Sequence, residues 1–290
     1  MPEMEKALDE LKSLGVNSIA IHPYAKIGED GHLFTGQGPT AETTHISTPL
    51  RWARERGMSV MLTPHIAYWG TKFLWRGEIN FATPEEWEIF FKDYEKWIVQ
   101  MASLAEAGHA PVFCMGLEYS FAQKFEERWR KMIGAVRSVY HGKLTYGANW
   151  NEYAEVKFWD ALDYIGVLAY FPLTKTEDPS AAELTAAWEK RCAELDKFSQ
   201  EKGKQFLFTE IGYNENARTA AEPWSFKTGG LHAAEIQARC IDVALRLPAK
   251  HPFLAGMFWW KWYPEIPHHE TENYRLQTAA IKALIAKHWK

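Results

Sequence analysis

The feature that most constrains this chain is a regular alternation between short apolar runs and longer stretches with helical periodicity. The short runs are rich in β-branched and aromatic residues and are apolar on both faces, which is typical of strands buried in a parallel sheet. We predict seven such strands, at residues 18–24, 59–66, 112–119, 144–150, 164–171, 205–213 and 255–263.

The stretches around these strands predict amphipathic helices. They cover residues 3–14, 48–56, 84–107, 126–139, 181–202, 232–247 and 276–289. Thr83 followed by Pro84 fits a helix cap and first turn. Gly15, Gly57 and Gly203 stand where helices are expected to end, since glycine readily adopts the left-handed conformation of a helix C-terminus.

Apolar strands separated by helices require a parallel sheet covered by helices, which leaves the β/α barrel and the open doubly wound sheet. The barrel is favoured because no glycine-rich turn follows the first strand, where a dinucleotide-binding sheet carries one. Polar and aromatic residues also gather at the carboxyl ends of the strands, where barrel enzymes place their chemistry. These residues are His22, His65, Glu118, Asn149, Tyr170, Glu210 and Trp260.

A closed barrel of this type has eight strands, whereas this sequence predicts seven. A first strand lies upstream of Met1, or the barrel closes in another way, or residues 28–44 contain a further strand. We favour the first explanation because the chain opens directly on a helix. The expected fold is α/β, a (β/α)8 barrel of the TIM-barrel type with its first strand missing from this chain, forming a single catalytic domain over residues 1–290.

Charge and composition exclude several classes of partner. Lys plus Arg total 33 against 37 Asp plus Glu, so the formal charge of −4 provides no basic field for nucleic acid or an anionic membrane. The N-terminus lacks a signal-peptide pattern, and no apolar stretch is long enough to span a bilayer. The sequence as written therefore predicts a cytoplasmic protein, or a secreted one if an upstream segment has been removed. It leaves the oligomeric state open.

Two glutamates stand out as candidates for catalysis. Glu118 in MGLEYSF and Glu210 in FTEIGYN each end an apolar strand next to aromatic residues. A charge at such a position is costly unless it faces a wet cleft or has partners. A single case would be explained by a side chain that reaches solvent or caps the next helix. Two cases on separate strands of one barrel favour a functional pair.

Glycoside hydrolysis is the chemistry that uses two carboxylates in an aromatic-lined cleft. One carboxyl protonates the leaving oxygen, and the other attacks the anomeric carbon or activates water. The chain supplies many aromatic side chains, with 14 Trp, 12 Tyr and 16 Phe, although core packing explains most aromatics in most proteins. Tyr170 lies on the strand between the two glutamates and is a candidate donor to Glu210; otherwise it only packs at the strand end.

Several strings in this sequence resemble those of a known family. They are WRGEINF at 75–81, LTYGANWNEY at 144–153, FWDALDYIGVLAYFPL at 158–173, FTEIGY at 208–213 and FWWKW at 258–262. They are similar to those of glycoside hydrolase family 113, a family of retaining β-mannanases with eightfold β/α barrels. Its clan has the acid/base at the end of strand four and the nucleophile at the end of strand seven. The resemblance covers nearly the whole chain.

The resemblance implies that Glu118 is the acid/base and Glu210 the nucleophile. With one strand missing before Met1, these glutamates fall on strands four and seven. Tyr170 would lie beside the nucleophile, and Trp260 would form the aromatic floor of the subsite at the cleavage point. Further residues implied to bind the substrate are His65, Arg76 and Asn149. The implied substrate is β-1,4-linked mannan or manno-oligosaccharide, cleaved without a metal or an organic cofactor.

Two positions depart from the family pattern. Leu117 replaces a small polar residue before the acid/base, and Leu168 stands where an aspartate is often found in the sixth strand. The preferred sugar therefore stays open, with an exo-acting β-mannosidase or a glucanase of the same clan as alternatives. A catalytically silent barrel that only binds glycans is a further alternative.

Other candidate motifs favour structural explanations. His268 and His269 are adjacent rather than helix-spaced, and no HExxH or GxSxG motif occurs. His22 and His65 are either sugar contacts or structural histidines. The remaining candidates are expected to be buried: the three cysteines Cys114, Cys192 and Cys240, and the helix-spaced aromatics Trp87, Phe90, Phe91, Tyr94 and Trp97.

Overall fold

The computed structural model describes residues 2–35, 38–264 and 274–290. The chain divides into two compact units. We call Ser18–Gly166 the central unit, and Met1–Asn17 together with Val167–Lys290 the terminal unit. The single domain over residues 1–290 stays a prediction.

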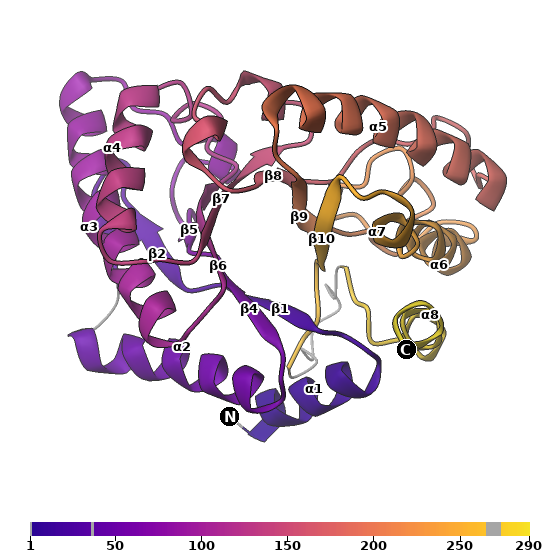
Figure 1. Ribbon diagram of the computed structural model, residues 1–290. Coiled ribbons are helices and arrows are strands. Elements are labelled where there is room, and N and C mark those ends of the chain that lie inside the picture. The colour runs from indigo at the N-terminus through magenta and orange to yellow at the C-terminus, as the bar shows by residue number, and fades with distance from the viewer. Residues whose placement is uncertain (1, 36–37, 265–273) are drawn as a thin grey trace. The chain divides into compact units, whose positions relative to one another are not determined.

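Parallel strands in chain order form the main sheet of the central unit (Figure 1). They are β1 (Ser18–Ile21), β4 (Ser59–Leu62), β6 (Val112–Leu117) and β7 (Lys143–Asn149). In β1 and β4, Ser18 lies opposite Ser59 and Ile21 opposite Leu62. Strands β6 and β7 are buried along nearly their whole length, which explains their apolar character on both faces. These strands confirm the sequence prediction.

A second, three-stranded sheet in the central unit corrects that prediction in detail. Strand β2 (Tyr24–Ile27) pairs in parallel with β5 (His65–Ala67) and antiparallel with β3 (Leu33–Phe34). The runs at 18–24 and 59–66 were each expected to be one strand, but each is interrupted by proline, at Pro23 and Pro64. Proline has no N–H for the ladder, so a new strand starts after each. Strand β3 falls within 28–44 but belongs to this small sheet.

Helices α2 (Gly38–Glu55), α3 (Pro84–Ala107) and α4 (Glu126–Arg137) cover the central unit, with α3 and α4 side by side (Figure 1). Helix α3 has the predicted bounds because Thr83 and Glu86 form a reciprocal capping box. The five predicted aromatics of this helix are buried, which confirms their role in packing. Helix α2 begins ten residues earlier than predicted and contains Pro49 in its interior.

The chain passes from the central to the terminal unit within β8 (Ile165–Leu168). The terminal unit continues with strands β9 (Phe206–Ile211) and β10 (Leu254–Trp259), which pair in parallel. Its helices are α1 (Pro2–Ser13), α5 (Ala181–Lys202), α6 (Ala233–Ala244), α7 (Leu247–Lys250) and α8 (Ala279–Trp289). Helices α1 and α8 are joined by an ion pair between Glu10 and Lys282 at 2.7 Å.

Two helix boundaries in the terminal unit differ from the prediction. The sequence predicts one helix over 232–247, but α6 ends at Ala244. A separate short helix, α7, begins at Leu247 and has Pro248 in its first turn. Helix α8 starts at Ala279 because the Thr278 side chain accepts the amide hydrogen of Ile281 as its cap. The glycine ends are confirmed, since Gly15, Gly57 and Gly203 all have positive φ.

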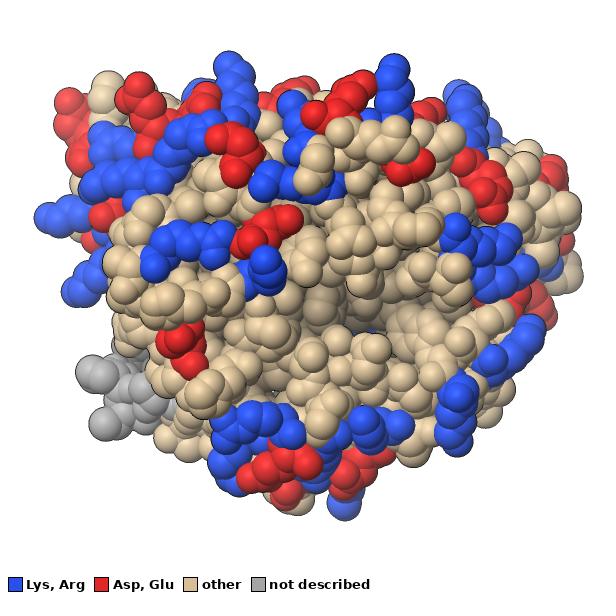
Figure 2. All heavy atoms as spheres, in the orientation of Figure 1, with Lys and Arg blue, Asp and Glu red and all other residues tan. Residues whose placement is uncertain are grey.

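Each of the seven predicted runs overlaps a strand of the main parallel sheet, which has seven strands in the described part of the chain. A first strand upstream of Met1 stays a prediction. Within the described ranges, no helix combines the length and apolarity needed to cross a bilayer. On the face drawn in Figure 2, basic and acidic side chains are interspersed near the edges of the view, and other residues fill its centre.

Candidate active site

Glu118 occupies a strained backbone position directly after β6. Its φ is +61°, in the left-handed region that residues other than glycine seldom adopt. Three hydrogen bonds from backbone N–H groups hold this turn. Glu118 N–H donates to Gly147 O (2.9 Å), Ser120 N–H to Glu118 O (3.0 Å), and Tyr119 N–H to the side-chain hydroxyl of the buried Tyr146 (3.1 Å). The turn fixes the position from which the Glu118 side chain starts.

The carboxylate of Glu118 forms an ion pair with Arg76. Arg76 Nη1 donates to Glu118 Oε2 at 2.8 Å, and the two side chains are only 13% and 17% exposed. The same guanidinium lies 5.9 Å from the ring centroid of Tyr68. A cation in this position favours the ionised carboxylate. The sequence resemblance pointed to Arg76 as a substrate contact, whereas its pairing with Glu118 was not foreseen.

His65 is fully buried, with 0% of its surface exposed. Its ring stacks on His22 at 4.4 Å and on Tyr24 at 5.3 Å, between ring centroids. Burial holds the pKa of His65 well below its usual range, and nearby Arg76 acts in the same direction. Burial likewise lowers the pKa of His22, which His65 and Arg76 lower further. Both shifts favour the neutral imidazole, and the role of His65 as a direct sugar contact stays a prediction.

Asn149, at the end of β7, is almost buried and is held by polar neighbours. Its Nδ2 donates to Glu152 Oε2 (3.2 Å) and to Ser120 Oγ (3.3 Å), while Ser120 Oγ donates to Glu152 Oε2 (2.7 Å). These bonds join the segment after Glu118 to the segment after β7. Glu152 had not been singled out from the sequence, because it lies in a loop with many charged residues.

Glu210 lies within β9 of the terminal unit and is 7% exposed. Tyr170 Oη donates a hydrogen bond to Glu210 Oε2 at 2.9 Å. The backbone also joins β9 to the residues after β8, because Ala169 N–H donates to Glu210 O at 2.7 Å. This geometry confirms Tyr170 as the predicted hydrogen-bond donor to Glu210. A donated hydrogen bond favours an ionised carboxylate, which is the form a nucleophile requires.

Trp260 and Lys261 follow β10 beside the strand that carries Glu210. Trp260 N–H donates to Ile211 O at 2.8 Å. The Lys261 ammonium lies 5.2 Å from the ring centroid of Trp260 and 4.8 Å from that of Tyr263. Burial lowers the pKa of Lys261, and the charge of Glu210 opposes this shift. In the sequence, only the position of Lys261 inside the aromatic run FWWKW points to this residue.

The two departures from the family pattern are core positions here. Leu117 and Leu168 both have 0% exposure. The three cysteines are buried, as predicted. Among the described residues no group of three or more His, Cys, Asp or Glu could hold a metal ion, and His268 and His269 lie outside the described residues.

The central unit thus groups Glu118 with Arg76, Asn149 and the histidines, and the terminal unit groups Glu210 with Tyr170 and Trp260. The model of glycoside hydrolase family 113 matches residues 1–278 of this chain. The chain belongs to this family. The resemblance to this family is confirmed, and so is the fold class, a β/α barrel whose main parallel sheet has seven strands among the described residues.

Solved structures of the same family are similar over the full chain. The family 113 β-mannanase from Alicyclobacillus acidocaldarius, in complex with ManMIm, has 25% identity and a TM-score of 0.85, covering 100% of this chain and 91% of that one. A family 113 β-1,4-mannanase in a complex structure has 22% identity and a TM-score of 0.85, covering 100% and 93%.

A more distant structure shares the fold alone. It is the family 5 mannosidase from Rhizomucor miehei, with 11% identity and a TM-score of 0.61 over 99% of this chain and 86% of that one. A comparison with curated proteins found no match.

Proposed function

We propose that this glycoside hydrolase cleaves β-1,4-mannosidic bonds within mannan or manno-oligosaccharides and retains the anomeric configuration. The family match over residues 1–278 carries this proposal. The β-mannanases among the solved relatives support the choice of sugar. The proposal assigns the acid/base role to Glu118 and the nucleophile role to Glu210.

In the first step, a carboxylate oxygen of Glu210 attacks the anomeric carbon and forms a glycosyl ester. The bond from that carbon to the leaving oxygen breaks, and Glu118 transfers its proton to this oxygen. The hydrogen bond from Tyr170 supports the role of Glu210, because it favours an ionised carboxylate before attack.

In the second step, Glu118 takes a proton from water, and the resulting hydroxyl oxygen attacks the anomeric carbon. The ester bond breaks and Glu210 leaves as a carboxylate. Glu118 is ionised at this stage, so the ion pair with Arg76 favours the state that acts as a base. The same pair must weaken before Glu118 carries a proton again.

Proton NMR of the first products from linear β-1,4-mannan tests the reaction. Retention gives the β-anomer first, followed by slow mutarotation, whereas initial α-anomer would contradict the proposed mechanism. Parallel assays on a β-1,4-glucan and a short aryl β-mannoside test the sugar and the mode of attack. Faster cleavage of the glucan than of mannan would indicate a glucanase. Release of single mannose units only would indicate an exo-acting β-mannosidase.

Added azide tests which glutamate has which role. With Glu118→Ala, azide replaces water in the second step and yields a β-mannosyl azide. With Glu210→Ala, azide makes the only displacement and yields an α-mannosyl azide. Exchanged products would reverse the two assignments.

A further inference from the structure

A chain of ring contacts in the central unit leads from the Glu118 ion pair to the protein surface. Arg76 pairs with Glu118 and lies near the ring of Tyr68. The Tyr68 ring is 6.1 Å from the ring of Trp69, which is 5.5 Å from the ring of Tyr24. Tyr24 is 40% exposed and Trp69 is 61% exposed. We call these last two residues the aromatic platform.

The inner side of the platform is rigidly supported. Tyr24 and His65 are register partners in the paired strands β2 and β5, and their rings stack at an interplanar angle of 26°. His65 in turn stacks on His22. The buried ring of His65 therefore provides a flat backing for Tyr24, and the ring of His22 supports His65.

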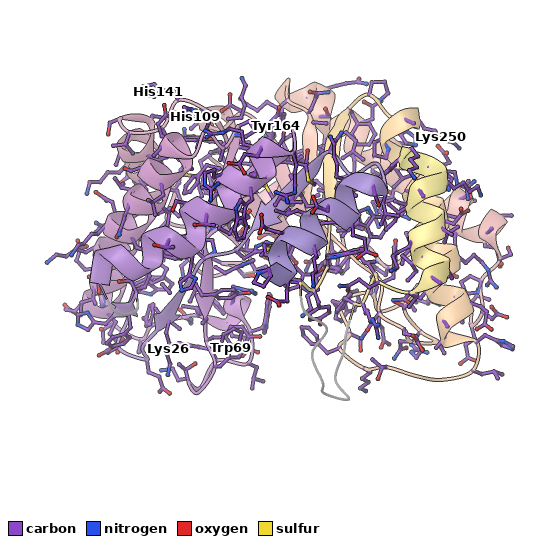
Figure 3. All side chains as sticks on the ribbon, turned by 90° about the horizontal axis from the view of Figure 1, so that it is seen from below. Lys26, Trp69, His109, His141, Tyr164 and Lys250 are labelled. Carbon is purple, nitrogen blue, oxygen red and sulfur yellow. The ribbon has the colours of Figure 1, made fainter. Side chains whose placement is uncertain are left out.

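The turn that carries Trp69 is also held in place. Thr71 donates to Tyr68 O twice, from its N–H at 3.2 Å and from its Oγ1 at 2.6 Å. Gly70 has a φ of +80°, a conformation that a larger residue would adopt only with strain. Lys26, labelled with Trp69 in Figure 3, belongs to β2, and its ammonium group lies close to Gly70. A pre-ordered ring beside a cationic donor suits a ligand with an apolar face and hydroxyl groups.

One exposed tryptophan is ordinary on a protein surface. The platform differs because its rings are contiguous with each other and, through Tyr68 and Arg76, with Glu118. We propose that Tyr24 and Trp69 bind a pyranose unit of the same glycan chain, away from the bond that is cleaved. This inference rests on the proposed function and adds a binding subsite to it.

Kinetics on long and short substrates test the platform. Trp69→Ala is expected to lower kcat/KM for mannohexaose about 5- to 10-fold, mainly through KM, and to change it less than about 2-fold for a short aryl β-mannoside. Trp69→Phe keeps a ring and is expected to recover part of the loss. Phe34→Ala is the matched control, since Phe34 is a 58% exposed aromatic in the same small sheet. Equal losses on both substrates, or an equal loss in Phe34→Ala, would overturn the proposal.

Binding measurements separate this proposal from the catalytic one. Affinity electrophoresis in gels containing soluble mannan is carried out with Glu210→Ala, alone and combined with Trp69→Ala. Loss of retardation on removing Trp69 supports the platform even if the wild type cleaves no mannan, which would contradict the proposed function alone. Unchanged retardation would overturn the proposed role of the platform. A change of oligomeric state in Trp69→Ala on size-exclusion chromatography would also overturn it, because Trp69 would then be a contact between copies of the chain.

Discussion

The two candidate carboxylates occupy contrasting surroundings. Glu118 lies after its strand, on a left-handed backbone, and its carboxylate contacts the cation of Arg76. Glu210 lies within its strand, is 7% exposed, and accepts a hydrogen bond from the neutral hydroxyl of Tyr170. A charged partner and a neutral hydrogen-bond donor stabilise the ionised carboxylate in different ways. Each carboxylate is therefore stabilised by contacts from its own unit: Arg76 contacts Glu118, and Tyr170 contacts Glu210.

Removing the buried carboxylate is expected to have the largest effect. Glu210→Ala should lower kcat on mannan by about 10⁴-fold or more, because no other group then forms the glycosyl ester. Reducing-end release measures kcat, and thermal unfolding verifies the fold. Glu215→Ala serves as a control, because Glu215 is an exposed carboxylate on the loop that follows β9. Near-normal hydrolysis by Glu210→Ala would remove the contrast between the two sites.

The second prediction concerns the hydrogen bond from Tyr170 to Glu210. Tyr170→Phe is expected to lower kcat about 10- to 100-fold with little change in KM, since the ring stays and only the hydrogen bond to Glu210 Oε2 is lost. Tyr274→Phe is the control: its ring contacts Tyr170, but its hydroxyl bonds to Pro223 O. An equal fall in kcat for the two variants would show that packing, not the donor, matters.

The third prediction concerns the ion pair between Arg76 and Glu118. Without the guanidinium, the ionised form of Glu118 loses a stabilising partner, so its pKa should rise. Arg76→Gln is then expected to shift the alkaline limb of the kcat/KM profile upward by about one pH unit. Arg128→Gln removes an exposed arginine paired with Glu88 and should leave the limb in place. A profile of Arg76→Gln that matches the wild type would rule out this coupling.

The smallest expected effect concerns the buried imidazoles beside Arg76. Burial lowers the pKa of His65 in the folded protein, while the unfolded chain keeps a value near 6.5. Below about pH 6.5 the unfolded state binds more protons, so the free energy of unfolding falls as the pH is lowered, by up to about 1.4 kcal/mol per pH unit. His22 adds a shift of the same sign.

Urea unfolding at pH 7.5, 6.5 and 5.5 measures this dependence. His65→Gln should flatten it, whereas His141→Gln, at a side chain that is 77% exposed (Figure 3), should not. An unchanged slope in His65→Gln would show that other groups dominate the acid sensitivity of the central unit.

The sequence was most informative where a local pattern is sufficient. Helix α3 has the predicted bounds because Thr83, Pro84 and Glu86 are adjacent in the chain and satisfy the first helix turn by themselves. Pro23 marks the point where 18–24 divides, but the sequence does not show that β2 joins a separate small sheet, because this depends on its pairing with β5 and β3. Glu152 and Lys261 were missed because each also depends on a residue far away in the sequence: Ser120 donates to Glu152, and the charge of Glu210 acts on Lys261.

By itself, the sequence determined the seven strands, the family, and the identity of the residues at the strand ends, because hydrophobic period and motif strings are properties of neighbours along the chain. The tertiary structure alone decided that Arg76 contacts Glu118 across forty-two positions, that Tyr170 donates to Glu210, and that rings from β2 and the turn after β5 meet. Such contacts depend on strand register and loop conformation, and distances in space follow from these rather than from spacing in sequence.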